Sequence, residues 1–163
     1  DEKISGYKQW MRERFGCTAA LKSPAHITLV APFWLADSKE NELLQVFDTF
    51  KTQSPAFPIT LNNFSHFNKN VLFVHVDANE ELAVLQSQVT AHLTSQFGRA
   101  IKPDLRPFHP HVTIATRDLS PTAFAKAWER FSREDFNAEF TCTTVSLLKL
   151  HPGKWIVIRE NKF

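Results

Sequence analysis

The chain repeats one order of structural elements, and this repeat constrains its fold more than any other feature of its 163 residues. Two stretches carry apolar residues at the spacing of a helix face, and each stretch ends in a Phe-Gly pair. The first stretch contains Tyr7, Met11 and Phe15, and the second contains Val89, Leu93 and Phe97. Because glycine readily adopts the left-handed conformation that ends a helix, we expect helix ends at Gly16 and Gly98.

A histidine and a threonine separated by one residue follow each of these helices. The two motifs are His26-Ile27-Thr28 and His111-Val112-Thr113, and each has a proline just upstream. The apolar residues within and after each motif predict a buried strand. Side chains alternate faces along a strand, so the His and the Thr of one motif are expected to project from the same face.

A second helix and two strands complete each half of the repeat. Asp37 or Ser38, with Glu40 as the partner of a capping box, predicts one helix start, and Ser120-Pro121 predicts the matching one. The buried faces are expected to contain Leu43, Phe47 and Phe50, and then Phe124, Trp128 and Phe131. Strands are predicted at Phe57–Phe67, Val71–Asp77, Phe140–Leu150 and Trp155–Arg159, with Pro152-Gly153 as the last turn.

The repeated elements predict an α+β fold built as one bilobal domain over residues 1–163. Residues 1–78 and 79–163 are expected to form two lobes related by a pseudo-two-fold axis. Two antiparallel sheets with helices on the outside then leave a central cleft, where one motif from each lobe meets the other. The first helix of the second half follows a strand, Val71–Asp77, so we expect an equivalent strand upstream of Asp1.

The composition limits the kind of substrate and partner that we expect for this chain. The net charge is +2 and the charges are scattered, whereas a protein that tracks many phosphates usually carries a basic stripe. We therefore expect a nucleotide or an RNA terminus as substrate, with no extended nucleic-acid footprint. No apolar run approaches the roughly 20 residues of a membrane helix, and no signal peptide is visible. Two cysteines, Cys17 and Cys142, make no disulfide framework, which favours the reducing cytoplasm. We also expect a monomer.

The two motifs together suit acid–base chemistry on a phosphate ester. Histidine titrates near neutral pH, so one imidazole can accept a proton while its partner donates one. A protonated imidazole also offsets the negative charge of a phosphate. A threonine hydroxyl can donate a hydrogen bond to a non-bridging oxygen as charge develops there. One such motif alone is more often a hydrogen-bonded structural histidine, and it is the matched position in the repeat that favours the paired function.

The sequence resembles the two-histidine (2H) phosphoesterase superfamily, which includes the bacterial 2′-5′ RNA ligase and the 2′,3′-cyclic nucleotide phosphodiesterases. Residues 24–33, PAHITLVAPF, resemble the first motif block of the family, and residues 106–115, RPFHPHVTIA, resemble the second. The closing hairpin, residues 145–155, is also similar, so the resemblance covers nearly the whole chain. The family usually begins with a strand before its first helix, in agreement with the strand expected upstream of Asp1.

The resemblance implies a bilobal α+β fold and a reaction that needs no metal or other cofactor. It implies that His26 and His111 are the catalytic pair and that Thr28 and Thr113 bind the phosphate. The implied activity is hydrolysis of RNA-derived 2′,3′-cyclic phosphates or 2′-5′ phosphodiester bonds. Which substrate and which product isomer apply, and which histidine is the acid, stay open at this point.

Three aromatic residues flank the motifs, namely Phe33, Trp34 and Phe108. They could stack on a base, since stacking on an aromatic ring tolerates any base. Packing in the core is an equally good interpretation of the same residues.

Two other functions remain open on sequence alone. A non-catalytic module that binds an RNA end or a nucleotide could use the same cleft. His109 and His111 also form a His-x-His pair, which is a possible half of a metal site. Few further ligands accompany that pair, because Asp104 and Asp118 are the carboxylates close to the motifs, and we therefore expect no metal.

Overall fold

The computed structural model describes residues 2–98, 100–102 and 106–163 of the chain. Over these residues the helices are α1 (Glu2–Phe15), α2 (Glu40–Thr49), α3 (Glu80–Phe97) and α4 (Pro121–Phe131), with short 3₁₀ turns η1 (Ala19–Lys22) and η2 (Asp37–Lys39). The strands are β1 (Phe57–Phe67), β2 (Val71–Val76), β3 (His111–Thr116), β4 (Asn137–Cys142), β5 (Thr144–His151) and β6 (Lys154–Lys162).

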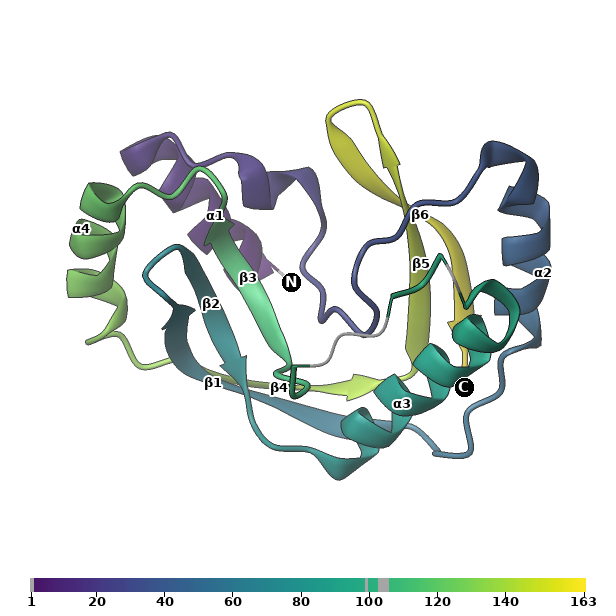
Figure 1. Cartoon of the computed structure of the whole chain (residues 1–163). Helices are drawn as coiled ribbons and strands as arrows, with labels where there is room; N and C mark the ends of the chain where they lie inside the picture. Colours follow the sequence, from purple (N-terminus) through teal and green to yellow (C-terminus); the bar gives the residue numbers. More distant parts are fainter. Residues whose placement is uncertain (1, 99, 103–105) are drawn as a thin grey trace.

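The strands form two antiparallel sheets, which confirms the predicted α+β class. One sheet has four strands in the order β3-β2-β1-β4, and the other is the β5–β6 hairpin. In Figure 1 the helices α1 and α4 lie at one side of the molecule, and α2 and α3 lie at the other. None of the described helices combines the length and the apolar composition that crossing a bilayer requires.

The strands are not divided between the sheets as the two sequence halves predict. The four-stranded sheet takes β1 and β2 from the first half and β3 and β4 from the second. The predicted strand Phe140–Leu150 is in fact two strands, β4 and β5, that belong to different sheets. The physical reason is the length of β1, since its first six residues pair with β4 while its second part pairs with β2. Because β1 forms backbone hydrogen bonds along both of its edges, strands from both halves of the repeat join one sheet.

Local signals place most helix ends. Gly16 ends α1 at φ +71°, and the Ser120 hydroxyl accepts a hydrogen bond from the backbone N–H of Ala123 at the start of α4. The helix end expected at Gly98 is confirmed, because α3 ends at Phe97, although Gly98 has φ −43° and is not left-handed. The expected capping box near Asp37 is wrong, because no side chain caps η2 or α2. There the chain enters the helix through a 3₁₀ turn instead of a capping box.

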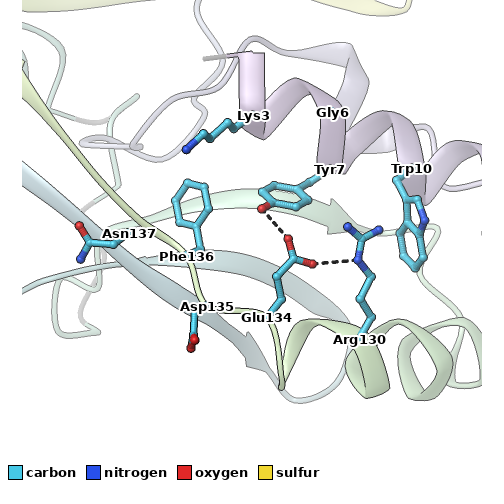
Figure 2. A pocket seen from close by; sticks show the side chains of 9 residues that line it. All are labelled: Lys3, Gly6, Tyr7, Trp10, Arg130, Glu134, Asp135, Phe136 and Asn137. Atoms are coloured by element: carbon cyan, nitrogen blue, oxygen red, sulfur yellow. Dashed lines mark hydrogen bonds and ion pairs between the residues drawn. The ribbon is translucent and has the colours of Figure 1, made fainter.

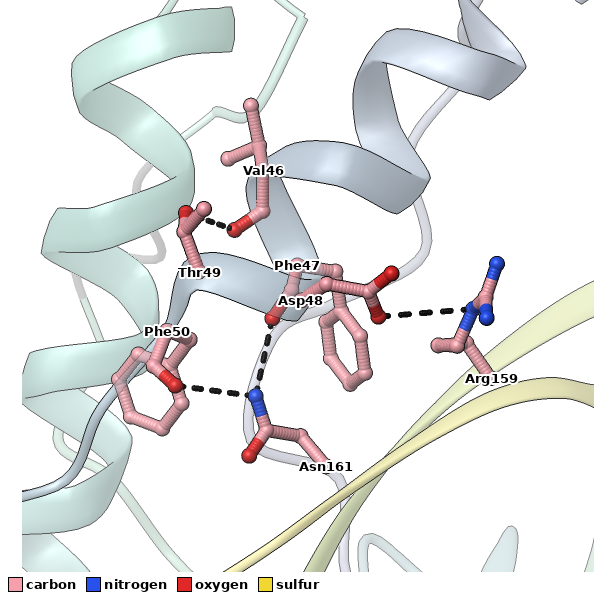
Figure 3. A network of polar contacts seen from close by, with 7 residues as sticks. All are labelled: Val46, Phe47, Asp48, Thr49, Phe50, Arg159 and Asn161. Carbon is pink, nitrogen blue, oxygen red and sulfur yellow. Dashed lines mark hydrogen bonds and ion pairs between the residues drawn. The ribbon is translucent and has the colours of Figure 1, made fainter.

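One continuous core joins the two sides. The buried faces of the helices carry the residues predicted for them, although Trp128 is only partly buried. Figure 3 shows how β6 is attached to α2, because the Asn161 side-chain amide donates to the carbonyls of Phe47 and Phe50, at 3.0 Å each. Arg159 adds an ion pair with Asp48, with 3.5 Å between Nε and Oδ1. The second sheet is thus fixed to its helix by polar contacts as well as by packing.

On the other side, α1 is joined to the segment between α4 and β4. The Tyr7 hydroxyl donates to Glu134 at 2.7 Å, and Arg130 pairs with the second oxygen of the same carboxylate at 2.8 Å (Figure 2). The Arg130 guanidinium also lies 4.5 Å from the centre of the Trp10 ring. A groove of about 520 Å³ runs beside these residues. Cys17 and Cys142 are both free thiols.

Candidate active site

Strand β3 carries the second motif at the edge of the four-stranded sheet. His111 and Thr113 are half-buried, whereas Val112 and Ile114 between and after them are fully buried. This alternation follows from the sequence, since the apolar residues occupy the face that packs on the core. On its inner side β3 pairs with β2, so that His75 lies opposite His111 and Phe73 lies opposite Thr113.

The first motif does not form the buried strand that its sequence predicts. Ile27 makes a single antiparallel bridge to Val112, and no named strand includes the segment. His26 and Thr28 are exposed, while Ile27 packs against the core. The physical reason is that a strand needs a ladder of backbone partners, and among the described residues this segment pairs at one position only.

That one bridge nevertheless fixes the two motifs against each other. In an antiparallel register, the neighbours of a bridged pair also lie opposite one another. His26 therefore lies beside Thr113, and Thr28 lies beside His111. Since Ile27 and Val112 turn to the core, alternation directs these four side chains to the other face. The structure thus brings together the two histidines and two threonines that the sequence singles out.

The two histidine rings are held in the same way. The Nδ1 of His26 lies 2.8 Å from the carbonyl oxygen of Pro24, and the Nδ1 of His111 lies 2.7 Å from that of His109. A carbonyl oxygen can only accept a hydrogen bond, so Nδ1 carries the proton in both rings. Each Nε2 is then the atom that gains or loses a proton. This shared arrangement is what two acid–base groups require.

Aromatic rings form a wall against His111. The ring centroids of Phe67 and Phe73 lie 5.0 Å and 4.9 Å from that of His111. Burial among these groups lowers the pKa of His111, and the nearby charges of His109 and His26 lower it further. The hydrogen bond to the His109 carbonyl acts in the opposite direction. His111 is therefore biased towards its neutral form, which is the form that accepts a proton.

The residues predicted for the site do not include Phe67 and Phe73, which form this wall, or the neighbouring His75. Phe67 and Phe73 look like ordinary core residues, and His75 looks like a surface histidine. The signal that would find them is the register of the hairpin 57–77 against the second motif, which a single sequence does not contain. His75 sits opposite His111, and its Nε2 lies 3.9 Å from a carboxylate oxygen of Asp77.

The three aromatic residues proposed to stack on a base have different surroundings. Phe33 and Phe108 are partly buried and pack against the core. Trp34 projects into solvent with 89% of its surface exposed. Of the three, Trp34 has a fully available ring face.

The side chains around His109 and His111 do not favour the alternative of a metal site. In the part of the chain that the structure describes, no three His, Cys, Asp or Glu side chains form a group that could hold a metal ion. His109 and His111 lie with ring centroids 6.4 Å apart. The Asp118 carboxylate is already taken up by backbone N–H groups at the start of η1, and Asp104 lies outside the described residues.

Comparison with known proteins agrees with this arrangement. A family model described as the 2′-5′ RNA ligase superfamily matches residues 1–154. The chain belongs to this superfamily. The resemblance to the two-histidine phosphoesterases is thereby confirmed.

Two relatives at the level of sequence come from bacilli. A protein of Geobacillus sp. strain WCH70, named "Putative phosphoesterase", is 26% identical over 159 residues, covering 96% of this chain and 87% of the relative. A protein of the same name from Bacillus pumilus is 26% identical over 162 residues, covering 96% and 88%.

Solved structures show the same fold at lower identity. The protein TT0787 of Thermus thermophilus superposes with a TM-score of 0.68 at 18% identity, covering 99% of this chain and 91% of the other. LigT of E. coli, crystallised with 3′-AMP, superposes with a TM-score of 0.60 at 19% identity, covering 99% and 92%. Likeness at this identity concerns the fold alone.

Proposed function

We propose that this member of the 2′-5′ RNA ligase superfamily is a phosphodiesterase that opens RNA-derived 2′,3′-cyclic phosphates or cleaves 2′-5′ phosphodiester bonds. The observation that carries the proposal is the antiparallel bridge between Ile27 and Val112, which sets both His-x-Thr motifs side by side. The family match and the phosphoesterase names of its relatives support the reaction class. The nucleotide bound to LigT supports a nucleotide substrate.

In the proposed reaction His111 is the base and His26 is the acid. The Nε2 of neutral His111 takes a proton from water as the water oxygen attacks phosphorus. The bond from phosphorus to one ribose oxygen breaks, and the Nε2–H of protonated His26 gives its proton to that oxygen. The lowered pKa of His111 favours this assignment, and the exposed ring of His26 keeps its hydration when charged.

The two threonines complete the site. Their hydroxyls donate hydrogen bonds to the non-bridging oxygens, where negative charge grows as water adds. Each threonine lies beside the histidine of the other motif, so a phosphate held by both hydroxyls has an imidazole at either end. Trp34 offers an exposed ring on which a base can stack. Because the histidines supply both proton transfers, the reaction needs no metal.

The proposal is tested by incubation with each of the four nucleoside 2′,3′-cyclic monophosphates and with a 2′-5′-linked dinucleotide. Phosphorus NMR of the products reports activity, base preference and product isomer together. We expect ring opening to one nucleoside monophosphate isomer, at a rate that EDTA does not change. Loss of activity in EDTA would instead favour a metal site at His109 and His111.

A non-catalytic RNA-end module using the same groups is the competing function. It predicts tight binding of a nucleoside 2′-monophosphate together with no turnover of any cyclic nucleotide. That combination of results would exclude the proposed phosphodiesterase.

A further inference from the structure

A second cavity lies beside the segment that leads to His26. Its volume is about 310 Å³, and it opens between α1, η1 and the turn of the β5–β6 hairpin. The lining includes Ser5, Lys8, Ser23, Pro24 and Lys154. Pro24 is the residue whose carbonyl holds the His26 ring, so this cavity and the candidate active site share a wall.

Lys8 is the unusual member of this lining. It lies on the buried face of α1 between Ile4 and Met11, and only 4% of its surface is exposed. Its Nζ donates one hydrogen bond to the carbonyl oxygen of Ser23, at 3.0 Å. No carboxylate of the described residues pairs with it, and burial alone lowers its pKa.

A buried ammonium group without a counter-charge is costly for the fold. It has three N–H donors, and the hydrogen bond to the Ser23 carbonyl uses one of them, while Lys8 is also part of the cavity lining. Lys154 brings a second positive charge from the hairpin, and Ser5 and Ser23 bring hydroxyl groups. Two cations and two hydroxyls around a small cavity are suited to an anion with several oxygens, such as a phosphate.

We propose that this cavity binds a second phosphate of the substrate, on the 5′ side of the nucleotide whose cyclic phosphate reacts. The inference rests on the proposed function and specifies its substrate as a 5′-phosphorylated nucleotide or the end of an oligonucleotide. Ser23 and His26 are three residues apart, so their Cα atoms lie within about 11 Å of each other. One nucleotide can therefore reach both sites.

The test compares two substrates, a nucleoside 2′,3′-cyclic phosphate and the same compound with a 5′-phosphate. The measured quantity is the ratio of their kcat/KM values, because a change in His26 or in the folded fraction affects both substrates and cancels. We expect wild-type protein to prefer the 5′-phosphorylated compound by about 10-fold or more. Lys8→Met brings the ratio close to one, and Lys154→Met lowers it by a smaller factor.

Lys3→Met is the matched control, since Lys3 lies on the same helix but outside the cavity, and it leaves the ratio unchanged. Lys154 is exposed, so its variant keeps the test informative if Lys8→Met does not fold. A wild-type ratio near one, or a ratio that Lys8→Met leaves intact, overturns the second phosphate site while the proposed reaction stands.

A binding measurement separates this inference from the proposed function. Inorganic phosphate is titrated into wild-type protein, and amide NMR shifts are followed at Ser5, Ser23 and Ala25. We expect shifts that are absent in Lys8→Met, whether or not any cyclic nucleotide is turned over. Shifts without turnover leave the anion site standing and refute the phosphodiesterase, whereas no shifts at these amides refute the anion site.

Discussion

Asp118, just after β3, accepts a hydrogen bond from the backbone nitrogen of Thr18 at 2.7 Å. The same carboxylate oxygen accepts from the backbone nitrogen of Ala19 at 2.9 Å and from the Thr18 hydroxyl at 3.3 Å. Thr18 begins the segment that leads to the first motif, and Asp118 ends the segment that follows the second. These contacts between residues 100 apart therefore help to hold the two motifs in register.

Replacing Asp118 should weaken both the fold and the site. Asp118→Ala leaves two backbone N–H groups without their acceptor, and we expect a loss of about 1–2 kcal/mol in the free energy of unfolding. We also expect a lower kcat on the cyclic substrate, because the first motif is less firmly placed. Urea unfolding and steady-state kinetics measure the two effects. Asp135→Ala, at another exposed carboxylate, is the control, and equal behaviour of both variants would contradict the assigned role of Asp118.

The paired histidines give the second prediction. His26→Ala and His111→Ala should each lower kcat/KM for a cyclic phosphate by about 10²–10⁴-fold, with circular dichroism unchanged. The double variant should lose little more than either single one, since the two groups act in one step. His66→Phe is the control, because His66 packs against the rings of Phe124 and Trp128 instead of lying at the site. Near-normal activity of either alanine variant would exclude the paired mechanism.

The threonine hydroxyls can be tested with an isosteric side chain. Thr28→Val and Thr113→Val remove one hydrogen-bond donor each while keeping the shape, and we expect kcat to fall by about 10²-fold. Thr141→Val changes an exposed threonine of β4, at the opposite edge of the sheet from β3, and should have no effect. If all three variants behaved alike, the hydroxyls would have no part in binding the phosphate.

Local chemistry predicts the elements of this fold better than it predicts their pairing. The Phe15-Gly16 end of α1, the Ser120 cap of α4 and the turn at Pro152-Gly153 each depend on a few neighbouring residues, and each is found. The break at Thr143, where one predicted strand becomes two, depends on which distant strand each part joins. Residues 137–142 pair with β1 and residues 144–151 pair with β6, and no local signal encodes that choice.

For the candidate site, too, the sequence predicts which residues take part better than it predicts how they are placed. The repeat alone places His26 and His111 at equivalent positions, and so it anticipates that the motifs meet. It does not show that one motif meets the other through a single bridge, nor that Phe67 and Phe73 line His111. Lys8 carries a local signal, since it occupies the apolar face of α1, but only the fold shows that a cavity adjoins it.

The lowered pKa of His111 predicts how stability depends on pH. Between that lowered pKa and the ordinary value of about 6.5, the unfolded chain binds a proton at this residue more readily than the folded protein does. The contribution of His111 to stability is therefore fully present above about pH 6.5 and is lost as the pH falls through the folded pKa. Thermal unfolding of wild-type protein and His111→Gln at pH 5 and pH 7.5 measures this, and the variant should depend less on pH. Identical pH profiles would show that burial does not bias this ring.

Tyr7 offers a direct measurement, because it is the single tyrosine of the chain. Its pKa is raised to about 12, chiefly by burial and further by the hydrogen bond and the charge of Glu134, while Arg130 opposes the shift. Phenolate absorbance should therefore remain low well above pH 10 while the protein is folded, and Glu134→Gln should shift the midpoint towards 10 without reaching it. The unfolded chain loses this proton near pH 10, so the contribution of Tyr7 to stability is complete below that pH and declines above it. A wild-type midpoint near 10, with circular dichroism still that of the folded protein, would show that the Tyr7–Glu134 contact does not form in solution.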